Sequence, residues 1–407
     1  MSTLKFYYSN EGEVIDNNLH FHFDEKDTKV IKKNNENRDV LSFSGIIIEG
    51  NRVFASFPKH YELKDKAKPN EDIKLLLNTI MKHYKENKGL YFSRIANLET
   101  NYPFEAFFNI YDYYHKFGMF NEEALLIGKN YSGRISWKRT IKKSTKVVSK
   151  RGLLFLPVQT IKKTKKYVFI SKCMAYAIDY TLKRFQLFFH LPLVGRESLK
   201  YDFFHNKNRV VVELKKLKSK VFKDNDRKLL IDLICFFEQL PAGDTYYLKH
   251  YTFSMVWEKT VENYLNCCFI GVSPKGLLFD KTQKAKNNFR KKTFHPNFAN
   301  PKQSIQPDHY FVKNKEQYIF DSKYYTKLEQ LDYKQIVYYF FLSKLSNPKS
   351  LKIEYSHTYN ALILPGSKEQ KVHFKFYPEY NPGEHNFIIY EYYLDVRSAM
   401  ELYICEK

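Results

Sequence analysis

Two acidic residues and a lysine in the C-terminal third have the types and spacing of a metal-dependent hydrolytic site. Asp308 follows a proline, and Asp321 and Lys323 are separated by one residue in an apolar segment. The surrounding β-forming residues predict strands at 306–312 and 317–325, with a turn at 313–316. Side chains two positions apart in a strand share a face, and a hairpin would bring Asp308 across to join the other two.

The expected cluster of two carboxylates and an ammonium suits phosphodiester hydrolysis. Two carboxylates this close repel each other unless a hard divalent cation lies between them, and Mg²⁺ binds through one or two carboxylates plus water and phosphate oxygens. The cation would stabilise charge that develops on the phosphate and would acidify a bound water. Lys323 would orient that water, deprotonate it or counter the transition-state charge. Mg²⁺ is therefore the expected cofactor, and Mn²⁺ is expected to be able to replace it.

Flanking helices make this pattern more specific. A carboxylate two residues before a base arises by chance roughly 7 times in a chain with 44 acidic and 67 basic residues, so the triplet alone identifies nothing. Residues 252–269 have apolar residues at helical spacing, with Glu258 beside the apolar stripe. Residues 332–345 predict a second helix with Gln335 one turn before Tyr339, where its amide could bond a phosphate, a water or the lysine. The alternative is a surface hairpin with solvated charges.

The rest of the sequence predicts a fold of the α+β or α/β class. Strands are expected at 4–8, 40–49 and 52–58, and helices at 72–84, 104–117, 168–189 and 228–240. The alternation in 133–141 indicates an edge strand or β-ribbon, and Pro241 with Gly243 predicts a break. We expect a β-rich N-terminal β/α domain at 1–150 that contacts a partner or DNA, a helical middle region at 151–243, and a domain at 244–407 with a mixed central sheet flanked by helices.

Positive charge is concentrated in one stretch. Lys and Arg number 67 against 44 Asp and Glu, a formal net charge of +23, which favours a polyanion such as nucleic acid as partner. AT-rich codons alone could produce part of this excess, but residues 124–178 hold fourteen Lys or Arg and no acid. This stretch would bind DNA or dock a ring-shaped ATPase or GTPase, through Lys138, Arg139, Lys142, Lys143, Lys162, Lys163, Lys165 and Lys166. Trp137 would stack on nucleic acid or serve as a core residue.

Composition excludes several other classes of protein. Hydrophobic residues make up 43 % of the chain, which indicates a folded globular protein. The apolar runs are far shorter than the ~20 residues of a membrane span, and the N-terminus has no hydrophobic signal core, so a cytoplasmic location is expected. Five cysteines include no CxxC pair, which argues against a disulfide framework and a zinc site.

Motifs spread along most of the chain resemble the LlaJI family of restriction endonucleases and, more distantly, McrC-type nuclease subunits. In the N-terminal part the motifs are Phe43-Ser-Gly45, Phe57-Pro-Lys-His-Tyr61 and Gly133-Arg-Ile-Ser-Trp-Lys-Arg-Thr140. In the C-terminal part they are Trp257-Glu258, Pro307-Asp308, Phe320-Asp-Ser-Lys-Tyr-Tyr325 and Gln335-xxx-Tyr339. Residues 150–245 contribute little to the likeness.

The resemblance implies a C-terminal domain of the PD-(D/E)xK type, like that of restriction endonucleases, with defined roles for the site residues. Asp308, Asp321 and Ser322 would be metal ligands, and Lys323 would be the catalytic lysine. Glu258 would be an auxiliary acid, and Gln335 would support the site. The expected enzyme is a Mg²⁺-dependent deoxyribonuclease that cleaves double-stranded DNA.

The resemblance also implies a cleavage subunit of a bacterial restriction or anti-phage defence system, often working with a separate AAA+ GTPase of the McrB kind. The chain has no GxxxxGK[ST] loop, so nucleotide hydrolysis would come from the partner. Double-strand cleavage needs two active sites, so a dimer or two converging complexes is expected. The alternatives are an adaptor that stimulates a partner NTPase, a stand-alone type II restriction endonuclease, and a protein that binds RNA or single strands through its basic surface alone.

Overall fold

A computed structural model shows a mixed α+β protein in two compact units, which confirms the predicted mixed class. It describes all residues except 1–3, 17–18, 34–35, 87–96, 130–132, 151, 186–191, 196–203, 205, 283–284, 326–327, 329, 345–354, 368, 378, 380–386 and 406–407. Unit 1 comprises Met1–Asn101 and Pro241–Lys407, and unit 2 comprises Tyr102–Leu240. The sequence predicts boundaries at residues 150 and 243, and the functions expected of its three domains stay predictions. Within the described residues, no helix is long and apolar enough to cross a membrane.

The N-terminal part of unit 1 is built on a five-stranded sheet. In pairing order its strands are β1 (Lys5–Asn10), β5 (Arg52–Phe57), β4 (Ser44–Glu49), β12 (Thr245–His250) and β6 (Leu98–Thr100). The apolar β4 and β5 are almost wholly buried, and a second hairpin is formed by β2 (Thr28–Lys33) and β3 (Glu36–Leu41). Gly45 is required in β4, because a Cβ there would lie 2.0 Å from the main-chain oxygen of Leu248 in β12.

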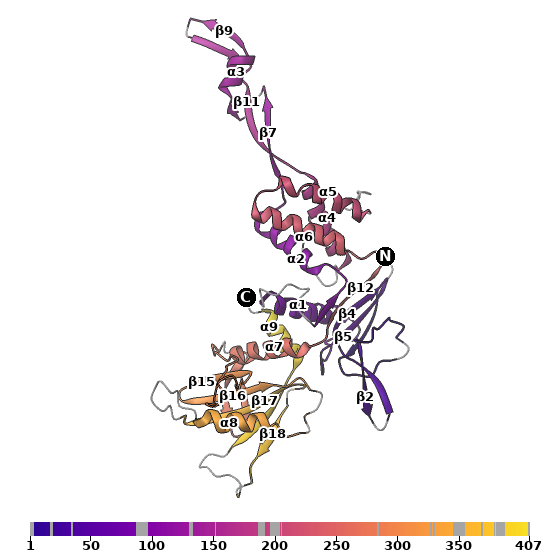
Figure 1. The fold of residues 1–407 in the computed structure, drawn as a ribbon, viewed down its shortest axis with the longest axis vertical. Coiled ribbons are helices and arrows are strands. Elements are labelled where there is room, and N and C mark those ends of the chain that lie inside the picture. Colours follow the sequence, from indigo (N-terminus) through magenta and orange to yellow (C-terminus); the bar gives the residue numbers. More distant parts are fainter. Residues whose placement is uncertain are drawn as a thin grey trace. The chain divides into compact units, whose positions relative to one another are not determined.

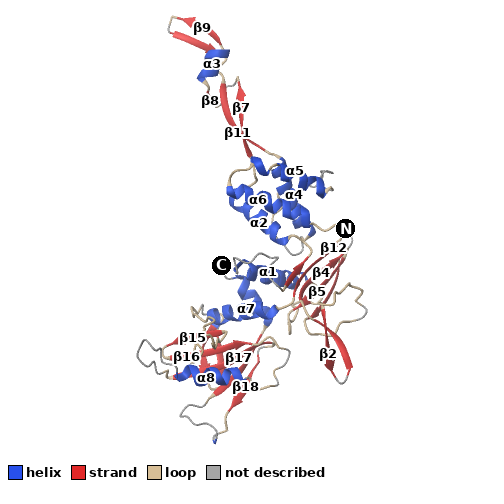
Figure 2. Ribbon diagram, in the orientation of Figure 1, coloured by secondary structure: helices blue, strands red, loops and turns tan. Residues whose placement is uncertain are grey.

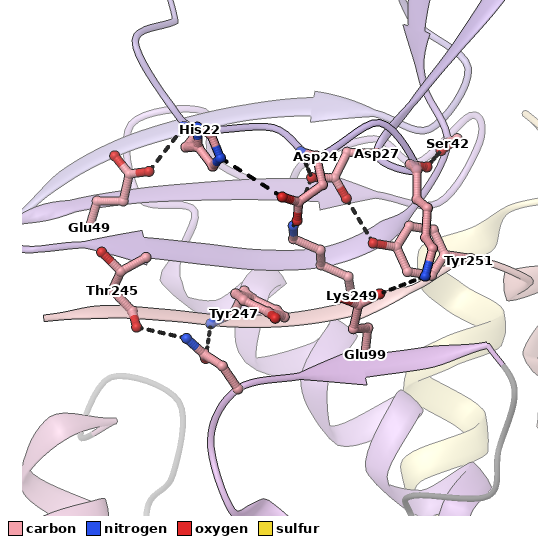
Figure 3. A network of polar contacts seen from close by, with 12 residues as sticks. His22, Asp24, Asp27, Ser42, Glu49, Glu99, Thr245, Tyr247, Lys249 and Tyr251 are labelled. Atoms are coloured by element: carbon pink, nitrogen blue, oxygen red, sulfur yellow. Dashed lines mark hydrogen bonds and ion pairs between the residues drawn. The ribbon is translucent and has the colours of Figure 1, made fainter. Parts of the chain in front are cut away.

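A buried ion-pair network fixes the loop before β2 to this sheet (Figure 3). The ammonium of Lys249, on β12, is 2.7 Å from a carboxylate oxygen of Asp27 and 2.8 Å from one of Asp24. Tyr251 donates a hydrogen bond to Asp27 at 2.9 Å. Lys249 and Asp27 are both buried, and a buried charge is tolerated only when it is paired and hydrogen-bonded. The network therefore holds the loop in one arrangement.

A mixed sheet forms the C-terminal part of unit 1 (Figures 1 and 2). In pairing order its strands are β15 (His309–Lys313), β16 (Glu316–Ser322), β17 (His357–Pro365), β19 (Ile388–Leu394) and β18 (Glu369–Lys375). β16, β17 and β19 run parallel, whereas β15 and β18 pair antiparallel at the two edges. The helices of unit 1 are α1 (Asn70–Glu86), α7 (Phe253–Cys268), α8 (Tyr333–Lys344) and α9 (Val396–Cys405), and β13 (Phe269–Ser273) pairs with β14 (Gly276–Phe279).

Two helices of unit 1 position the residues discussed below. α8 follows β16 in the chain and packs against β16 and β17, as a crossover between parallel strands does. α7 contacts β16 and also packs against α1 and α9. The predicted helices at 252–269 and 332–345 correspond to α7 and α8, except that Leu345 lies outside the described residues.

Unit 2 consists of helices and a projecting arm, residues 122–166 (Figure 1). The helices are α2 (Phe104–Phe117), α4 (Phe169–Arg184), α5 (Lys207–Lys216) and α6 (Asp224–Gln239), with a short 3₁₀ turn η4 (Lys218–Lys220). The arm comprises β7 (Glu122–Gly128), β8 (Arg134–Ile135), α3 (Trp137–Lys143), β9 (Thr145–Ser149), β10 (Gly152–Leu156) and β11 (Thr160–Lys166).

The arm corrects three sequence-based predictions. Residues 133–141 do not form a continuous strand, because α3 begins at Trp137 directly after the two-residue β8. Residues 152–156 form β10 and residues 160–166 form β11, so the predicted middle region is not helical throughout. Trp137 is 58 % exposed and therefore is not a core residue. Residues 186–189 of the helix predicted at 168–189 lie outside the described residues.

Candidate active site

The predicted hairpin is present, but its strands are shorter than predicted: β15 begins at His309 and β16 ends at Ser322, so Asp308 and Lys323 lie just outside the strands and not within them. β15 and β16 pair in antiparallel register and are joined by Asn314 and Lys315, whose φ angles are 52° and 66°. Two successive residues with positive φ form a tight turn whose twist matches that of paired strands, and asparagine adopts this conformation more readily than most residues. The turn sets the register, with His309 opposite Phe320, so that Asp308 lies across from Asp321.

Asp308 and Asp321 form a pair of carboxylates at the end of this hairpin. The main-chain N–H of Asp308 donates to Oδ1 of Asp321 at 3.1 Å, and the N–H of Ser322 donates to Oδ2 of Asp308 at 3.2 Å. Burial, and then the negative charges of Asp321 and Glu258, raise the pKa of Asp308 to about 7. Burial also raises the pKa of Asp321, against the opposing charge of Lys323.

This carboxylate pair has the donor chemistry that a hard divalent cation requires. Asp308 and Asp321 line a cavity of about 460 Å³, and burial is the main cause that raises the pKa of each carboxyl, with the charge of Asp321 adding to the effect at Asp308. Mg²⁺ commonly uses one or two carboxylates and keeps several waters. Within the described residues there is no group of three or more His, Cys, Asp or Glu that could hold a metal ion. The residues therefore fit a cation held by two carboxylates and solvent, and do not form an all-protein cage.

The ammonium of Lys323 lies between two carboxylates. Its Nζ is 3.3 Å from Oδ2 of Asp321 and 2.8 Å from Oδ2 of Asp332. Burial acts to lower the pKa of Lys323, but the charge of Asp321 and the hydrogen bond to Asp332 outweigh burial and raise this pKa. The other oxygen of Asp332 accepts the N–H of Gln335 at 3.1 Å, which fixes Asp332 at the start of α8. Lys323 is therefore held as a fixed positive charge at neutral pH.

Lys291 contacts both Glu258 and the carboxylate pair. The Nζ of Lys291 is 2.7 Å from Oε1 of Glu258, on α7, and 3.7 Å from Oδ1 of Asp308. Glu258 also contributes to the raised pKa of Asp308. The structure thus places Glu258 beside the site, and its role as an auxiliary acid stays a prediction.

The side chains of Gln335 and Ser322 contact residues other than Lys323 in the hydrogen bonds described here. Gln335 is fully buried, and its side-chain oxygen accepts a hydrogen bond from Asn360, on β17, at 2.9 Å. The hydroxyl of Ser322 lies 2.6 Å from Nε2 of His309. Burial, with the nearby charge of Lys291, lowers the pKa of His309 to about 3, so this imidazole is neutral. Gln335 therefore braces α8 against β17 within the described contacts, and the hydroxyl of Ser322 is engaged by His309.

The N-terminal sheet contributes to the same cavity. Glu11 and Lys59 line this cavity together with the carboxylate pair and Lys323. Tyr324, which directly follows Lys323, donates to Oε2 of Glu11 at 2.9 Å and accepts the main-chain N–H of Lys59 at 2.9 Å. The ammonium of Lys59 lies 4.8 Å from the centre of the Tyr324 ring. The end of β16 is thus fastened to the N-terminal sheet.

The eight basic residues predicted to bind DNA or a partner lie on α3 and β11 of the arm. All eight are exposed: Lys138, Arg139, Lys142, Lys143, Lys162, Lys163, Lys165 and Lys166. Lys163 forms an exposed ion pair with Glu123 at 2.9 Å. These residues belong to unit 2, whereas the carboxylates and Lys323 belong to unit 1, and their binding role stays a prediction.

Sequence reasoning missed several residues that complete the site. Asp332 carries a usable signal, because it is the first residue of the helix predicted at 332–345, and an aspartate at a helix start is a typical N-cap. Lys59 lies within the motif at 57–61, although its contact with Tyr324 depends on the fold. Lys291 and Glu11 have no periodic neighbours that indicate their position, so only the structure places them.

Comparison with known proteins places the chain in a family. No curated protein matches it. Among solved structures, a similar chain occurs in a half-complex from a tetradecameric assembly of Thermococcus gammatolerans McrB AAA+ hexamers with bound McrC. The two chains are 12 % identical, with 92 % of this chain and 84 % of that chain covered and a TM-score of 0.38. The model of the LlaJI restriction endonuclease family matches residues 43–388. Because this match spans most of the sequence, the chain belongs to the LlaJI restriction endonuclease family.

Proposed function

We propose that the chain is a Mg²⁺-dependent DNA endonuclease with a site of the PD-(D/E)xK type. The observation that carries this proposal is the meeting of Asp308, Asp321 and Lys323 at one end of the β15–β16 hairpin, in one cavity. Membership of a restriction endonuclease family implies nuclease activity, and such enzymes generally use a divalent metal. The identity of the metal and the roles below are part of the proposal.

The side chains divide the work between metal binding and charge. Asp308 and Asp321 hold the cation. Glu258 is an auxiliary acid, which Lys291 links to Asp308. A bound Mg²⁺ supplies Lewis-acid stabilisation of the phosphate and favours ionisation of water. Lys323, fixed by Asp332, supplies a positive charge next to the scissile phosphate and does not act as a base while both carboxylates hold it. Gln335 keeps α8 in place through Asn360.

Cleavage assays with matched variants test the proposal. The full chain is incubated with plasmid and linear DNA and Mg²⁺, with and without a candidate GTPase partner and GTP. Asp321→Ala is expected to abolish cleavage, whereas Glu369→Ala, which removes an exposed acid on β18, is expected to leave cleavage intact. Identical behaviour of wild type and Asp321→Ala in every condition would refute the nuclease proposal.

The proposed setting is a bacterial restriction or anti-phage system with a partner of the AAA+ GTPase class. The chain has no phosphate-binding loop of its own, and the arm presents both exposed cations and exposed apolar residues such as Leu125, Leu154 and Val148. A surface of this kind supports a contact with DNA or with the NTPase. Charge reversal at Lys138 and Arg139 distinguishes a DNA contact from an NTPase contact. If the arm contacts DNA, the variant should bind naked DNA more weakly. If the arm contacts the NTPase, the variant should lose only the GTP-dependent activity.

The activator alternative and the stand-alone endonuclease are outcomes of the same assays. If the chain is an activator, the wild type and Asp321→Ala would stimulate nucleotide hydrolysis by the partner equally, and the wild type would not cleave DNA. A stand-alone enzyme would cleave without partner or nucleotide. Because double-strand cleavage needs two active sites, dimerisation on DNA is also proposed, and analytical ultracentrifugation with and without DNA tests it.

A further inference from the structure

A second basic segment without acids lies beside the candidate site, and apart from Lys291 the proposed function assigns it no role. Residues 285–306, here named the basic loop, contain five Lys or Arg and no Asp or Glu. They connect the α7–β14 region to β15, at one edge of the C-terminal sheet. Within the described residues, Lys286, Arg290 and Lys302 have no carboxylate partner in an ion pair. The basic loop therefore offers cations that the protein does not neutralise.

The base of the basic loop is firmly anchored. The side chain of Asn287 donates to the main-chain oxygens of Leu265 and Phe269 at 3.2 and 2.7 Å. Phe289 is buried, and its N–H and carbonyl both bond the side chain of Asn266. Arg290 exchanges two main-chain hydrogen bonds with Tyr310, on β15, at 3.2 and 2.9 Å. The loop thus begins as an extension of the sheet edge.

The tip of the basic loop is a hydrogen-bonded turn that presents the phenyl ring of Phe298. Phe294 and Ile305 exchange two main-chain hydrogen bonds of 2.9 Å and so close the loop below the tip. The side-chain oxygen of Asn297 accepts the N–H of Ala299 at 2.9 Å, and the side-chain amide of Asn297 donates to Gln303 at 2.6 Å. Phe298, between them, is 101 % exposed. The turn therefore holds a phenyl ring entirely in solvent.

The basic loop also contacts Asp308 of the carboxylate pair. Lys291, one residue after Arg290, is the lysine that contacts Glu258 and Asp308. The ammonium of Lys292 lies 4.5 Å from the centre of the Tyr310 ring. A molecule bound along the exposed side of this loop would therefore extend directly from the carboxylate pair.

We propose that the basic loop is a DNA-contacting element of the nuclease domain, with Phe298 stacking on or wedging between bases. This inference rests on the proposed function for the identity of the substrate. Exposed cations without acids match the charge of a phosphate backbone, and aromatic side chains on a fixed turn stack on bases or enter base steps. A protein partner would need a wider apolar surface, but the neighbours of Phe298 at the tip are Asn297, Ala299, Asn300 and Pro301.

Base stacking is tested with a short duplex that carries 2-aminopurine at several positions. The full chain is used in an Asp321→Ala background, so that the duplex stays intact. Binding is expected to change the 2-aminopurine fluorescence, and Phe298→Ala is expected to remove this change and to weaken binding about tenfold. Tyr377→Ala is the matched control, because Tyr377 is also highly exposed but follows β18 at the opposite edge of the sheet.

The phosphate contacts are tested by the salt dependence of the same binding. Arg290→Gln and Lys302→Gln are each expected to reduce the slope of log affinity against log salt by about 1, whereas the exposed Lys375→Gln on β18 leaves it unchanged. The inference is overturned if Phe298→Ala binds DNA and alters the fluorescence as its parent does, or if the parent does not bind DNA at all. If Phe298→Ala weakens DNA binding but the wild-type chain cleaves no DNA under any condition, the basic loop still contacts DNA and the nuclease proposal is wrong.

Discussion

Asp308→Asn is expected to stabilise the metal-free protein while it abolishes cleavage. The substitution keeps an oxygen that can accept the N–H of Ser322, and it replaces one of two mutually repelling carboxylates by an amide that can donate to Asp321. Lys291 loses Asp308 but keeps Glu258 at 2.7 Å. The variant therefore removes negative charge from the site without leaving a buried cation unpaired.

The expected gain follows from the raised pKa of Asp308. Its ordinary value is 3.8 and its value here is about 7, so the folded state binds this proton more tightly than the unfolded state does. Wild-type stability is therefore lost as pH rises from about 4 to 7, and the loss is complete above pH 7. At ~1.4 kcal/mol per pH unit, the difference corresponds to at most about 4 kcal/mol. The difference in the free energy of unfolding between Asp308→Asn and the wild type should vanish near pH 4 and be largest above pH 7.

Urea unfolding in EDTA measures this advantage. Trp257 is fully buried on α7, with its ring 6.4 Å from that of Tyr324, and Trp137→Phe removes the only other tryptophan. Asp39→Asn, at an exposed position on β3, is the control. An Asp308→Asn variant that is no more stable than wild type at pH 8, or whose advantage is the same at pH 4 and pH 8, would refute the electrostatic reasoning. Added Mg²⁺ should stabilise the wild type more than the variant.

Three further variants probe the supports of the site. Asp332→Asn should free the ammonium of Lys323 and slow single-turnover cleavage roughly 10- to 100-fold with unchanged DNA affinity, and equal rates would exclude a positioning role for Asp332. Tyr324→Phe removes both hydrogen bonds of the hydroxyl, to Glu11 and from the main-chain N–H of Lys59, and should lower the free energy of unfolding by about 1–3 kcal/mol in the Trp257 assay. Lys249→Met leaves Asp27 buried without its cation and should cost about 3–5 kcal/mol, whereas a cost below about 1 kcal/mol would show that water reaches this carboxylate.

The hairpin was predictable because its signals are local. Segments rich in β-forming residues define β15 and β16, and the two-residue turn of Asn314 and Lys315 fixes their register, so that local signals bring Asp308 opposite Asp321, with Lys323 two residues further on. Helical periodicity likewise indicated α7 and α8. Sequence spacing alone therefore predicts the hairpin and the existence of the two helices, whereas the packing of the helices on the sheet depends on tertiary contacts.

The remaining contacts depend on tertiary structure and were not predictable. α3 is only seven residues long, its buried residue is Thr140, and its position depends on hydrogen bonds with Gln159 across the arm, so periodicity did not reveal it. The ion pair between Lys323 and Asp332 needs the crossover at α8. The contact between Glu11 and Tyr324 joins residues separated by 313 positions, which no local pattern encodes.

The pairing of β6 with β12 has a consequence for how this architecture can change in evolution. These two antiparallel strands are neighbours, with Thr100 opposite Leu248, and the Asn101 side chain bonds the carbonyl of Thr245 at 2.9 Å. All of unit 2 lies between them in the sequence, so it is an insertion into the loop of a hairpin. A short turn from Asn101 to Thr245 could close that hairpin, since loop length costs little free energy. A gene could therefore gain, lose or exchange the module that carries the arm while the sheet that supports Tyr324 keeps its strands.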